Sequence, residues 1–203
     1  MTRIRNPEQT RARLLEAGFL EIYKHGFQAA SIDRILKHTS VTKGAFFHHF
    51  RTKKDLGYAV VDEVIARMIA DQWEVPLRSS VDPMATILQS FETGIRLLEA
   101  ARPNLGCPLN NLAQEMSPID SGFQKRTERV FKLWTDTFAK SIRRAIKVGQ
   151  VQKSVDPKST ALYLVAQIEG ILSLAKNSQD PRVLRSGLKS MSRYIGLLLI
   201  PGG

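Results

Sequence analysis

The stretch from Ser31 to Phe50 constrains the fold more than any other part of the chain. Its first half places apolar residues three and four positions apart, the spacing of one helix face. Its second half opens at Thr42, a residue type that favours helix N-termini, and continues with apolar residues at helical spacing. The pattern predicts two short helices joined by a tight turn. This unit places its second helix in the major groove of DNA.

With its flanks, the stretch resembles the DNA-binding domain of the TetR family of bacterial transcriptional regulators. The resemblance covers roughly the first 60 residues. It departs from the family pattern at Ser40, where glycine is frequent, and at Phe47, where tyrosine is common. The residues that carry it, in order and spacing, are Gly26-Phe27, Ser31-Ile32-x-x-Ile35, the run from Val41 to Phe50, and Lys53-x-x-Leu56.

The outer side of the second predicted helix carries cationic, hydrogen-bonding and aromatic side chains, which suit phosphates and base edges. A lysine in the first turn of the next helix opposes the helix dipole, and a nearby phosphate would relieve that conflict. From these features and the resemblance we predict that DNA contacts involve Ser31, Thr42, Lys43, Gly44, Ala45, Phe47, His48, His49 and Lys53.

Charge supports this location of the DNA contacts. The chain has a net charge of +11. Residues 1–54 hold 11 Lys and Arg against 4 Asp and Glu, whereas the remaining residues hold 19 against 15. A concentrated basic end is typical of a phosphate-binding surface.

The rest of the chain also has helical patterns, with helix starts at Asp-Pro and Ser-Pro pairs and no alternating strand pattern. The sequence therefore predicts an all-α protein. Residues 1–54 are expected to form a three-helix, helix-turn-helix DNA-binding domain. Residues 55–203 are expected to form a helical ligand-binding and dimerisation domain, with a long linking helix that ends at Pro76.

The last two predicted helices have apolar arcs wider than one packing partner requires. Two such helices can pack against the same pair of a second copy, which the TetR resemblance also implies. The alternative is that both helices are central in a monomer. The residues predicted for the dimer interface are Leu164, Ile168, Ile171, Leu172, Leu184, Leu188, Met191 and Ile195.

A small-molecule pocket is expected among the C-terminal helices, although the same residues also suit core packing. Cys107 precedes Pro108 at a predicted helix start, where a thiol is favoured as thiolate. It is either a sensor, as in some TetR-type repressors, or a structural cysteine that fills a gap. The predicted ligand-binding residues are Cys107, Asn110, Asn111, Gln114, Trp134, Phe138, Tyr163 and Gln167.

Enzymatic motifs are missing: the sequence contains no P-loop, GxGxxG, CxxC or HExxH pattern. We expect no catalytic residues, no metal and no cofactor, and a cytoplasmic location away from the membrane. The resemblance implies a homodimeric regulator, a repressor, that binds a palindromic double-stranded operator and leaves it when a small-molecule effector binds or a cysteine is modified. The alternatives are a helical protein-interaction module that does not bind DNA, and a helical enzyme.

Overall fold

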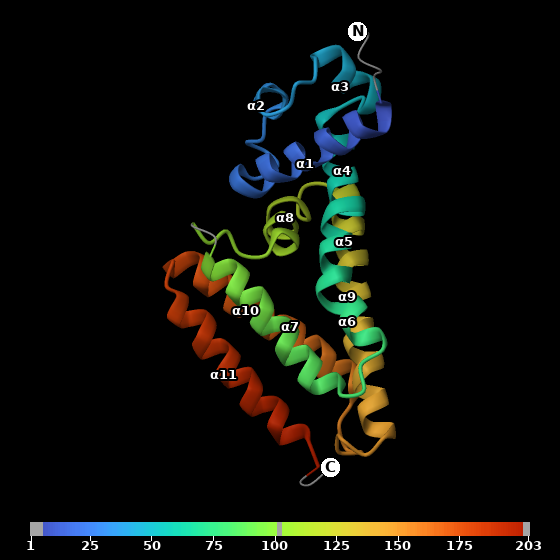
Figure 1. Ribbon diagram of the computed structural model, residues 1–203, viewed down its shortest axis with the longest axis vertical. Helices are drawn as coiled ribbons and strands as arrows, with labels where there is room; N and C mark the ends of the chain where they lie inside the picture. Colours follow the sequence, from blue (N-terminus) through green and yellow to red (C-terminus); the bar gives the residue numbers. More distant parts are fainter. Residues whose placement is uncertain (1–5, 101–102, 201–203) are drawn as a thin grey trace. The chain divides into compact units, whose positions relative to one another are not determined.

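The structure, a computed structural model, describes residues 6–100 and 103–200. Within these residues the fold is helical, which confirms the all-α prediction, and the β-type pairing is limited to one isolated bridge between Val151 and Leu199. No helix in the described part of the chain is long and apolar enough to cross a membrane. The α-helices in Figure 1 are α1 (Pro7–His25), α2 (Ile32–Lys37), α3 (Lys43–His49), α4 (Lys53–Ala59), α5 (Ala66–Ile69), α6 (Val75–Arg78), α7 (Pro83–Ala100), α8 (Pro108–Met116), α9 (Ser121–Lys147), α10 (Pro157–Ser178) and α11 (Pro181–Leu198).

The chain divides into two compact units that do not follow the predicted boundary after residue 54. Unit 1 contains the residues up to Arg67 together with Pro108–Glu128. Unit 2 contains Met68–Cys107 and the residues from Arg129 onward. The helices around the predicted DNA-reading motif therefore pack with a segment from the middle of the chain.

Unit 1 has a small aromatic and aliphatic core. Phe46 and Phe50 of the helix-turn-helix are buried, and so are Leu14 and Leu56. The ring of Phe123, at the start of α9, lies 4.6 Å from that of Phe27. Helix α9 thus completes the core under the first three helices.

The predicted start of α9 is wrong. A helix was expected to open at Ser117-Pro118, but α9 begins at Ser121. The Asp120 carboxylate accepts hydrogen bonds from the backbone N–H groups of Gly122 and Phe123, at 2.9 and 3.0 Å. Asp120 therefore caps α9, because its side chain satisfies N–H groups that have no helical partner.

The long linking helix also differs from its prediction. It continues to Arg78 instead of ending before Pro76. It contains two wider, π-helical segments, η1 (Val60–Ile65) and η2 (Ala70–Glu74). Pro76 follows η2 closely, and the backbone before and after it is helical, so the proline does not end the helix here.

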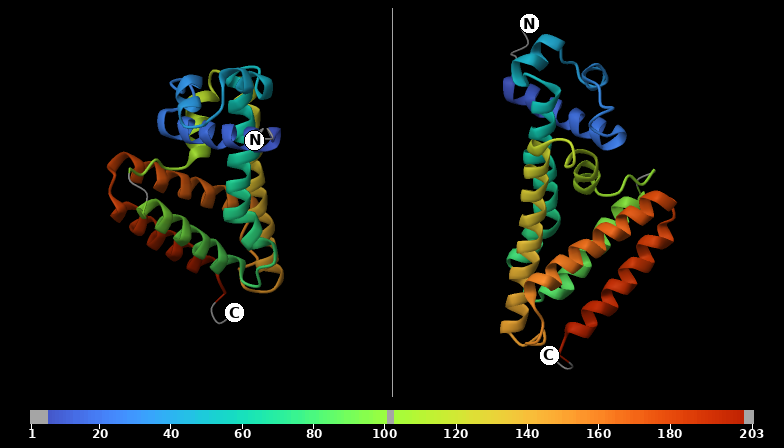
Figure 2. Two further views of the ribbon diagram at one scale, coloured as in Figure 1. Left: turned by 45° about the horizontal axis from the view of Figure 1, so that its top comes forward. Right: turned by 180° about the vertical axis from the view of Figure 1, so that it is seen from behind.

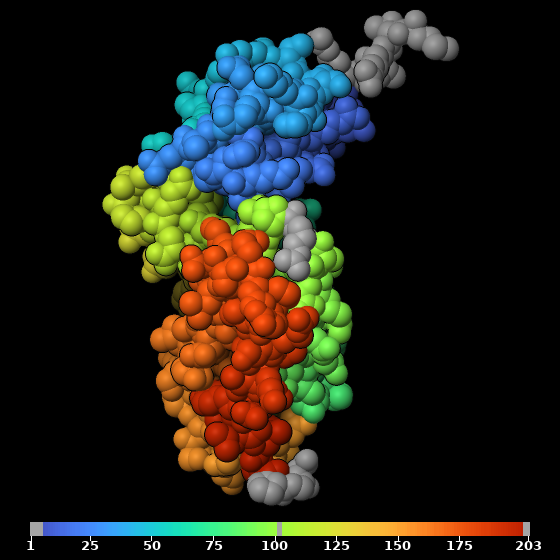
Figure 3. All heavy atoms as spheres, turned by 90° about the vertical axis from the view of Figure 1, so that its left-hand side faces the viewer, coloured from blue at the N-terminus to red at the C-terminus, as the bar shows by residue number. Residues whose placement is uncertain are grey.

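Unit 2 is built around aromatic rings and a pair of neighbouring helices. Trp73 stacks on Trp134 with ring centroids 5.1 Å apart, and Phe138 meets Trp73 edge-on. Helices α10 and α11 lie side by side, and α7 flanks α11 (Figures 2 and 3). Gly187 permits the close approach of α10 and α11, since a Cβ atom there would lie 2.5 Å from Cγ2 of Ile171.

Candidate nucleic-acid interface

Helix α3 is fixed on one side and open on the other. Its N-cap Thr42 accepts a 3.2 Å hydrogen bond from the N–H of Ala45, as the sequence predicted. Phe46 is fully buried beneath it. The opposite face exposes Thr42, Lys43, Gly44 and His48, and Phe47 keeps 44% of its surface exposed. Five of the nine predicted DNA contacts are therefore brought together on one exposed face.

A buried carboxylate of α1 holds α2 in place. The buried carboxylate of Glu21 in α1 accepts hydrogen bonds from the backbone N–H of Ser31, at 3.2 Å, and from Nε of Arg34, at 2.5 Å. His25 lies 3.8 Å from the same carboxylate. Ser31, predicted to contact DNA, uses its N–H inside the protein. Glu21 thus joins α2 to α1, a role that the sequence analysis did not predict.

Lys43 forms an ion pair at the edge of the exposed face. Its Nζ lies 3.2 Å from Oδ1 of Asp33, and the side chains are 61% and 72% exposed. Asp33 is on α2, so the pair bridges the two helices of the motif. Sequence reasoning missed Asp33, since an isolated acid in a helical pattern carries no signal of its partner.

Lys53 has a different environment from the one predicted. Its Nζ donates to the backbone carbonyls of Phe27, Gln28 and Ala30, at 2.9, 3.1 and 2.9 Å. It also lies 4.8 Å from the centroid of the Phe27 ring. An ammonium group has three donors, and these bonds occupy all of them. Lys53 therefore supports the turn between α1 and α2, and its predicted contact with DNA stays a prediction.

The same turn is held from the other side by α8. The Glu115 carboxylate accepts hydrogen bonds from the N–H groups of Phe27 and Gln28, both at 2.8 Å. Gly26 makes this approach possible, since its φ is +80° and a Cβ there would lie 2.9 Å from Glu115 Oε2. No local pattern could predict this contact, because Glu115 is 88 residues from Phe27 in the chain.

The start of α4 is also neutralised internally. Lys54 Nζ lies 2.9 Å from the Asp120 carboxylate, which also accepts a 2.8 Å hydrogen bond from the Tyr58 hydroxyl. These bonds, that of Lys54 above all, hold the pKa of Asp120 well below its usual range. The conflict between the helix dipole and the lysines in the first turn of α4 is thus relieved by groups of the same unit.

His49 and Ala45 belong to α3 but are half-buried, so they do not lie fully on its open face. Burial lowers the pKa of His49, and the nearby charges of His48 and Arg11 lower it further. Arg11 is itself bound by two 2.6 Å hydrogen bonds to the Glu63 carboxylate. The lowered pKa favours the neutral imidazole, which is a hydrogen-bonding rather than a cationic group.

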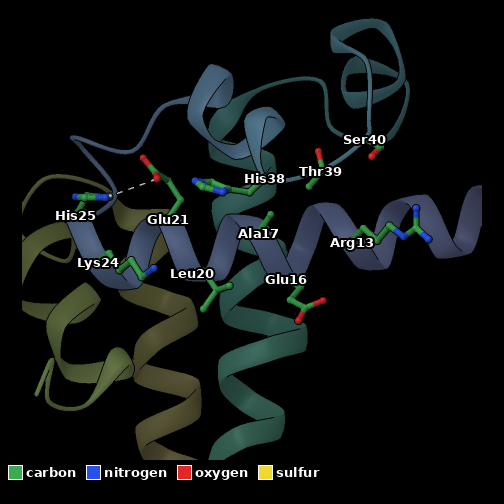
Figure 4. A pocket seen from close by; sticks show the side chains of 10 residues that line it. All are labelled: Arg13, Glu16, Ala17, Leu20, Glu21, Lys24, His25, His38, Thr39 and Ser40. Carbon is green, nitrogen blue, oxygen red and sulfur yellow. Dashed lines mark ion pairs between the residues drawn. The ribbon is translucent and has the colours of Figure 1, made fainter. Parts of the chain in front are cut away.

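A cavity of about 510 Å³ opens between α1 and the turn of the helix-turn-helix (Figure 4). Its walls combine His38, Thr39 and Ser40 of the turn with side chains of α1 that include Arg13 and Lys24. None of the predicted ligand-binding residues lines it. Its lining is mixed in charge, with Glu16 and Glu21 beside Arg13 and Lys24.

The predicted ligand-binding residues are divided between the two units, and the pocket they were expected to line stays a prediction. Asn110, Asn111 and Gln114 belong to unit 1, and the other five belong to unit 2. Within unit 2, Cys107, Trp134 and Phe138 are buried. Tyr163 is 43% exposed and packs on Tyr194 at 4.6 Å, and Gln167 is exposed as well.

Most of the predicted dimer residues are core residues of this chain. Five are at most 3% exposed: Leu164, Ile168, Leu184, Met191 and Ile195. Ile171, Leu172 and Leu188 are half-buried. The apolar arc read from the sequence is largely covered by the chain itself. The exposed apolar residues of α10 and α11 are their neighbours, such as Leu162, Leu174 and Leu197.

Comparison with known proteins identifies the family. A family model described as "Bacterial regulatory proteins, tetR family" matches residues 14–60, and one described as "Tetracyclin repressor-like, C-terminal domain" matches residues 83–191. An uncharacterised HTH-type transcriptional regulator in the lacX 3' region of Lactococcus lactis subsp. lactis is 30% identical over 194 residues, which cover 94% of this chain and 97% of the relative.

One further relative and one solved structure are similar to the chain. The transcriptional regulator AcuR of Cereibacter sphaeroides is 29% identical over 187 residues, covering 89% of this chain and 83% of AcuR. The crystal structure of regulatory protein TetR from Rhodobacter sphaeroides is 26% identical with a TM-score of 0.82, covering 94% of this chain and 99% of that one. The predicted family and its helical architecture are confirmed, and the chain belongs to the TetR family of bacterial transcriptional regulators.

Proposed function

We propose that the chain binds a palindromic operator duplex as a homodimer in the cytoplasm, with α3 in the major groove, and represses transcription until an effector releases it. The observation that carries this proposal is the open face of α3. That face is polar, aromatic and cationic, and it is held on a rigid three-helix core.

The side chains on α3 divide into two roles. Thr42 and Lys43, at the helix start, are suited to base edges, because recognition helices present their N-terminal residues to the bases. Phe47 offers an apolar surface for a thymine methyl group. Gly44 has nothing within 4 Å of its Cβ position, so the DNA backbone can approach it closely. His48 is suited to a phosphate oxygen.

The second copy is proposed to pack on the exposed faces of α10 and α11. Leu162, Ala166, Gly170 and Leu174 follow one another at four-residue intervals on α10 and are all exposed. Leu162 and Leu174 keep 63% and 64% of their surfaces accessible. A row of leucine and small residues allows two helices to approach closely, and it gives the dimer a two-fold axis that a palindromic operator can match.

The interface proposal is tested by Leu174→Glu in the full chain. The glutamate would place a charge within the interface, so analytical ultracentrifugation should detect monomer. Ile119→Glu is the matched control, because Ile119 is 62% exposed but lies in unit 1. A Leu174→Glu variant that remains dimeric at the wild-type concentration would remove this face from the interface.

We infer that the effector acts on DNA binding through α8. Its Glu115 holds the turn between α1 and α2, and α8 belongs to the same compact unit as the reading helix. A movement of α8 would therefore reach α2 and α3 without passing through α4. An effector that prefers one position of α8 shifts the population between binding and non-binding forms.

The effector is proposed to be non-covalent, with modification of Cys107 as the alternative. The Cys107 side chain is only 7% exposed, and buried thiols are usually inert. Treatment with N-ethylmaleimide distinguishes the two cases. If wild type loses operator affinity and Cys107→Ser does not, the cysteine is the sensor. Equal behaviour of both proteins supports a non-covalent effector.

The DNA-binding proposal is tested by selecting duplexes from a random library with the full chain, followed by fluorescence anisotropy at several salt concentrations. We expect a palindromic consensus, a Kd of roughly 10⁻⁸ M or tighter, and an affinity that falls steeply with salt. Binding without sequence preference or salt dependence would contradict the proposal and favour a protein-interaction module. The family contains transcriptional regulators, so turnover of a substrate is not expected.

A further inference from the structure

The most informative feature outside the expected contacts is Asp33. It is a 72% exposed carboxylate next to the start of the reading helix, 3.2 Å from Lys43 Nζ. A carboxylate on a surface that faces phosphates disfavours DNA binding unless it makes a compensating contact, because like charges repel. We propose that Asp33 and Lys43 together read one G·C base pair in each operator half-site, with Asp33 as a specificity-determining residue. This inference rests on the proposed binding of α3 in the major groove.

The spacing of the two charged groups matches one base pair. In a G·C pair the guanine O6 and the cytosine N4 are joined by a hydrogen bond, so they lie about 2.9 Å apart. Both atoms are presented in the major groove, O6 as an acceptor and the second N4 hydrogen as a donor. Lys43 Nζ and Asp33 Oδ1, 3.2 Å apart, form a donor and an acceptor at nearly the same spacing. A lysine on O6 and N7 and a carboxylate on N4 would satisfy all of these groups at once.

The same pair of side chains discriminates against A·T. In the major groove adenine offers its only amino donor between two acceptors, N7 of adenine and O4 of thymine. A carboxylate placed on that donor would face both acceptors and be repelled. In a G·C pair the donor lies at the cytosine side, and the acceptors O6 and N7 are left to the lysine. The two side chains therefore match a G·C pair and not an A·T pair.

The pair also has the flexibility and support that reading requires. Asp33 lies in the first turn of α2 and Lys43 begins α3, so both are anchored by helices that Glu21 and Phe46 fix to the core. Their side chains remain exposed and can adjust to a base pair. Neither residue is part of the buried core, so substitutions are expected to leave the fold intact.

The test uses the full chain and libraries of random duplexes. Wild type should select sequences in which one position of each half-site is fixed as G·C. Asp33→Ala should relax that position, with a loss of about tenfold in preference for G·C, while other positions stay unchanged. Its affinity for non-specific duplex should rise, since a negative charge has been removed. The charge-matched control is Asp71→Ala, an exposed acid of unit 2, which should alter no base preference.

A modified base checks the contact directly. N4-methylcytosine keeps the Watson–Crick pair but replaces the N4 hydrogen that points into the major groove. In the selected operator it should weaken wild type about tenfold and have no effect on Asp33→Ala, the result that a double-mutant cycle gives for a direct contact. Circular dichroism of Asp33→Ala verifies the fold.

The outcomes separate this inference from the proposed function. If wild type selects no DNA, the proposed function itself fails. If wild type selects an operator but Asp33→Ala changes affinity equally on all sequences, Asp33 only moderates the charge of Lys43 and the base-reading inference is overturned. Equal sensitivity of both proteins to N4-methylcytosine overturns it as well.

Discussion

Helices α3 and α4 each start with a threonine N-cap followed by a lysine, yet the two lysines differ in their binding partners. Lys43 of α3 is 61% exposed and touches one exposed acid. Lys53 of α4 donates to three backbone carbonyls of the turn between α1 and α2. Both threonines cap their helices, so the local structure is the same. The difference arises only from what the rest of unit 1 brings to each helix start.

The comparison shows that a basic residue in a DNA-binding motif can serve either the fold or the DNA. On the α4 side, the cations Lys53, Lys54 and Arg126 all bind groups within unit 1. On the α3 side, the reading face keeps Lys43 and His48 accessible. The basic charge counted in the first part of the sequence therefore overstates the charge that is free to meet phosphates.

The largest effect is expected from Lys53→Ala. Loss of three hydrogen bonds from a charged donor should lower the free energy of unfolding by about 2–3 kcal/mol, which lowers Tm by roughly 4–12 °C for a chain of this size. Lys43→Ala should leave Tm within about 1 °C but reduce the slope of log affinity against log salt by about one. Thermal unfolding and fluorescence anisotropy measure the two effects. A Lys53→Ala variant with unchanged Tm and a reduced slope would return Lys53 to the phosphate contacts.

A smaller effect is expected at Glu115, on the other side of the same turn. Glu115→Gln keeps one acceptor oxygen but removes the charge that strengthens its two bonds to backbone N–H groups. We expect a loss of about 1–2 kcal/mol in urea unfolding and weaker operator binding, because the turn positions α2. Gln114→Glu, one residue earlier and exposed, is the control. Operator affinity equal to wild type would argue against α8 as the route of control.

The two caps provide a matched pair with an effect of about 1 kcal/mol each. Thr52→Ala removes a capping box with Asp55, and Thr42→Ala removes the bond to Ala45 N. Both should destabilise the fold by similar amounts in urea. Thr42→Ala alone should also change the selected operator sequence, since only that hydroxyl is proposed to face the bases. Altered selectivity in Thr52→Ala would mean that the α4 start also reaches the DNA.

The smallest effect is expected in the pH dependence of stability, and it concerns only the ion pair between Lys54 and Asp120 at the start of α4. The hydrogen bond from Lys54 lowers the pKa of Asp120 below its ordinary value of 3.8. A carboxylate with a lowered pKa stabilises the fold above its ordinary pKa, and this stability is lost as the pH falls below about 3.8. Asp120→Asn and Lys54→Met should therefore both reduce the loss of stability between about pH 4 and pH 2 in urea titrations. If both variants lose as much stability as wild type when the pH falls, the ion pair contributes too little to the acid sensitivity of the fold.

The sequence predicted much of the fold because helix starts are local. Thr42, Asp156 and Asp180 were recognised as caps, and each accepts a backbone hydrogen bond at its helix. It did not predict which side of an apolar helix is covered. Leu164 and Ile168 look like interface residues in a helical pattern, but they pack against the same chain. Which face is covered depends on contacts between residues far apart in sequence, such as Glu115 with Phe27. The spacing of apolar residues within one helix does not predict such contacts.

The discontinuity of unit 1 has a consequence for how the protein is made. Phe123 is fully buried against Phe27 and Tyr58, so the fold around the reading helix needs a residue that the ribosome adds about 70 positions after α3. A nascent chain that ends near Arg67 would leave those two rings facing water. The first three helices should therefore reach their folded packing only after α9 has begun to emerge, and an N-terminal fragment without residues 108–128 is expected to be less stable. Evolutionary exchange of sensing domains would have to preserve residues 108–128, or replace them with a segment that supplies an equivalent ring.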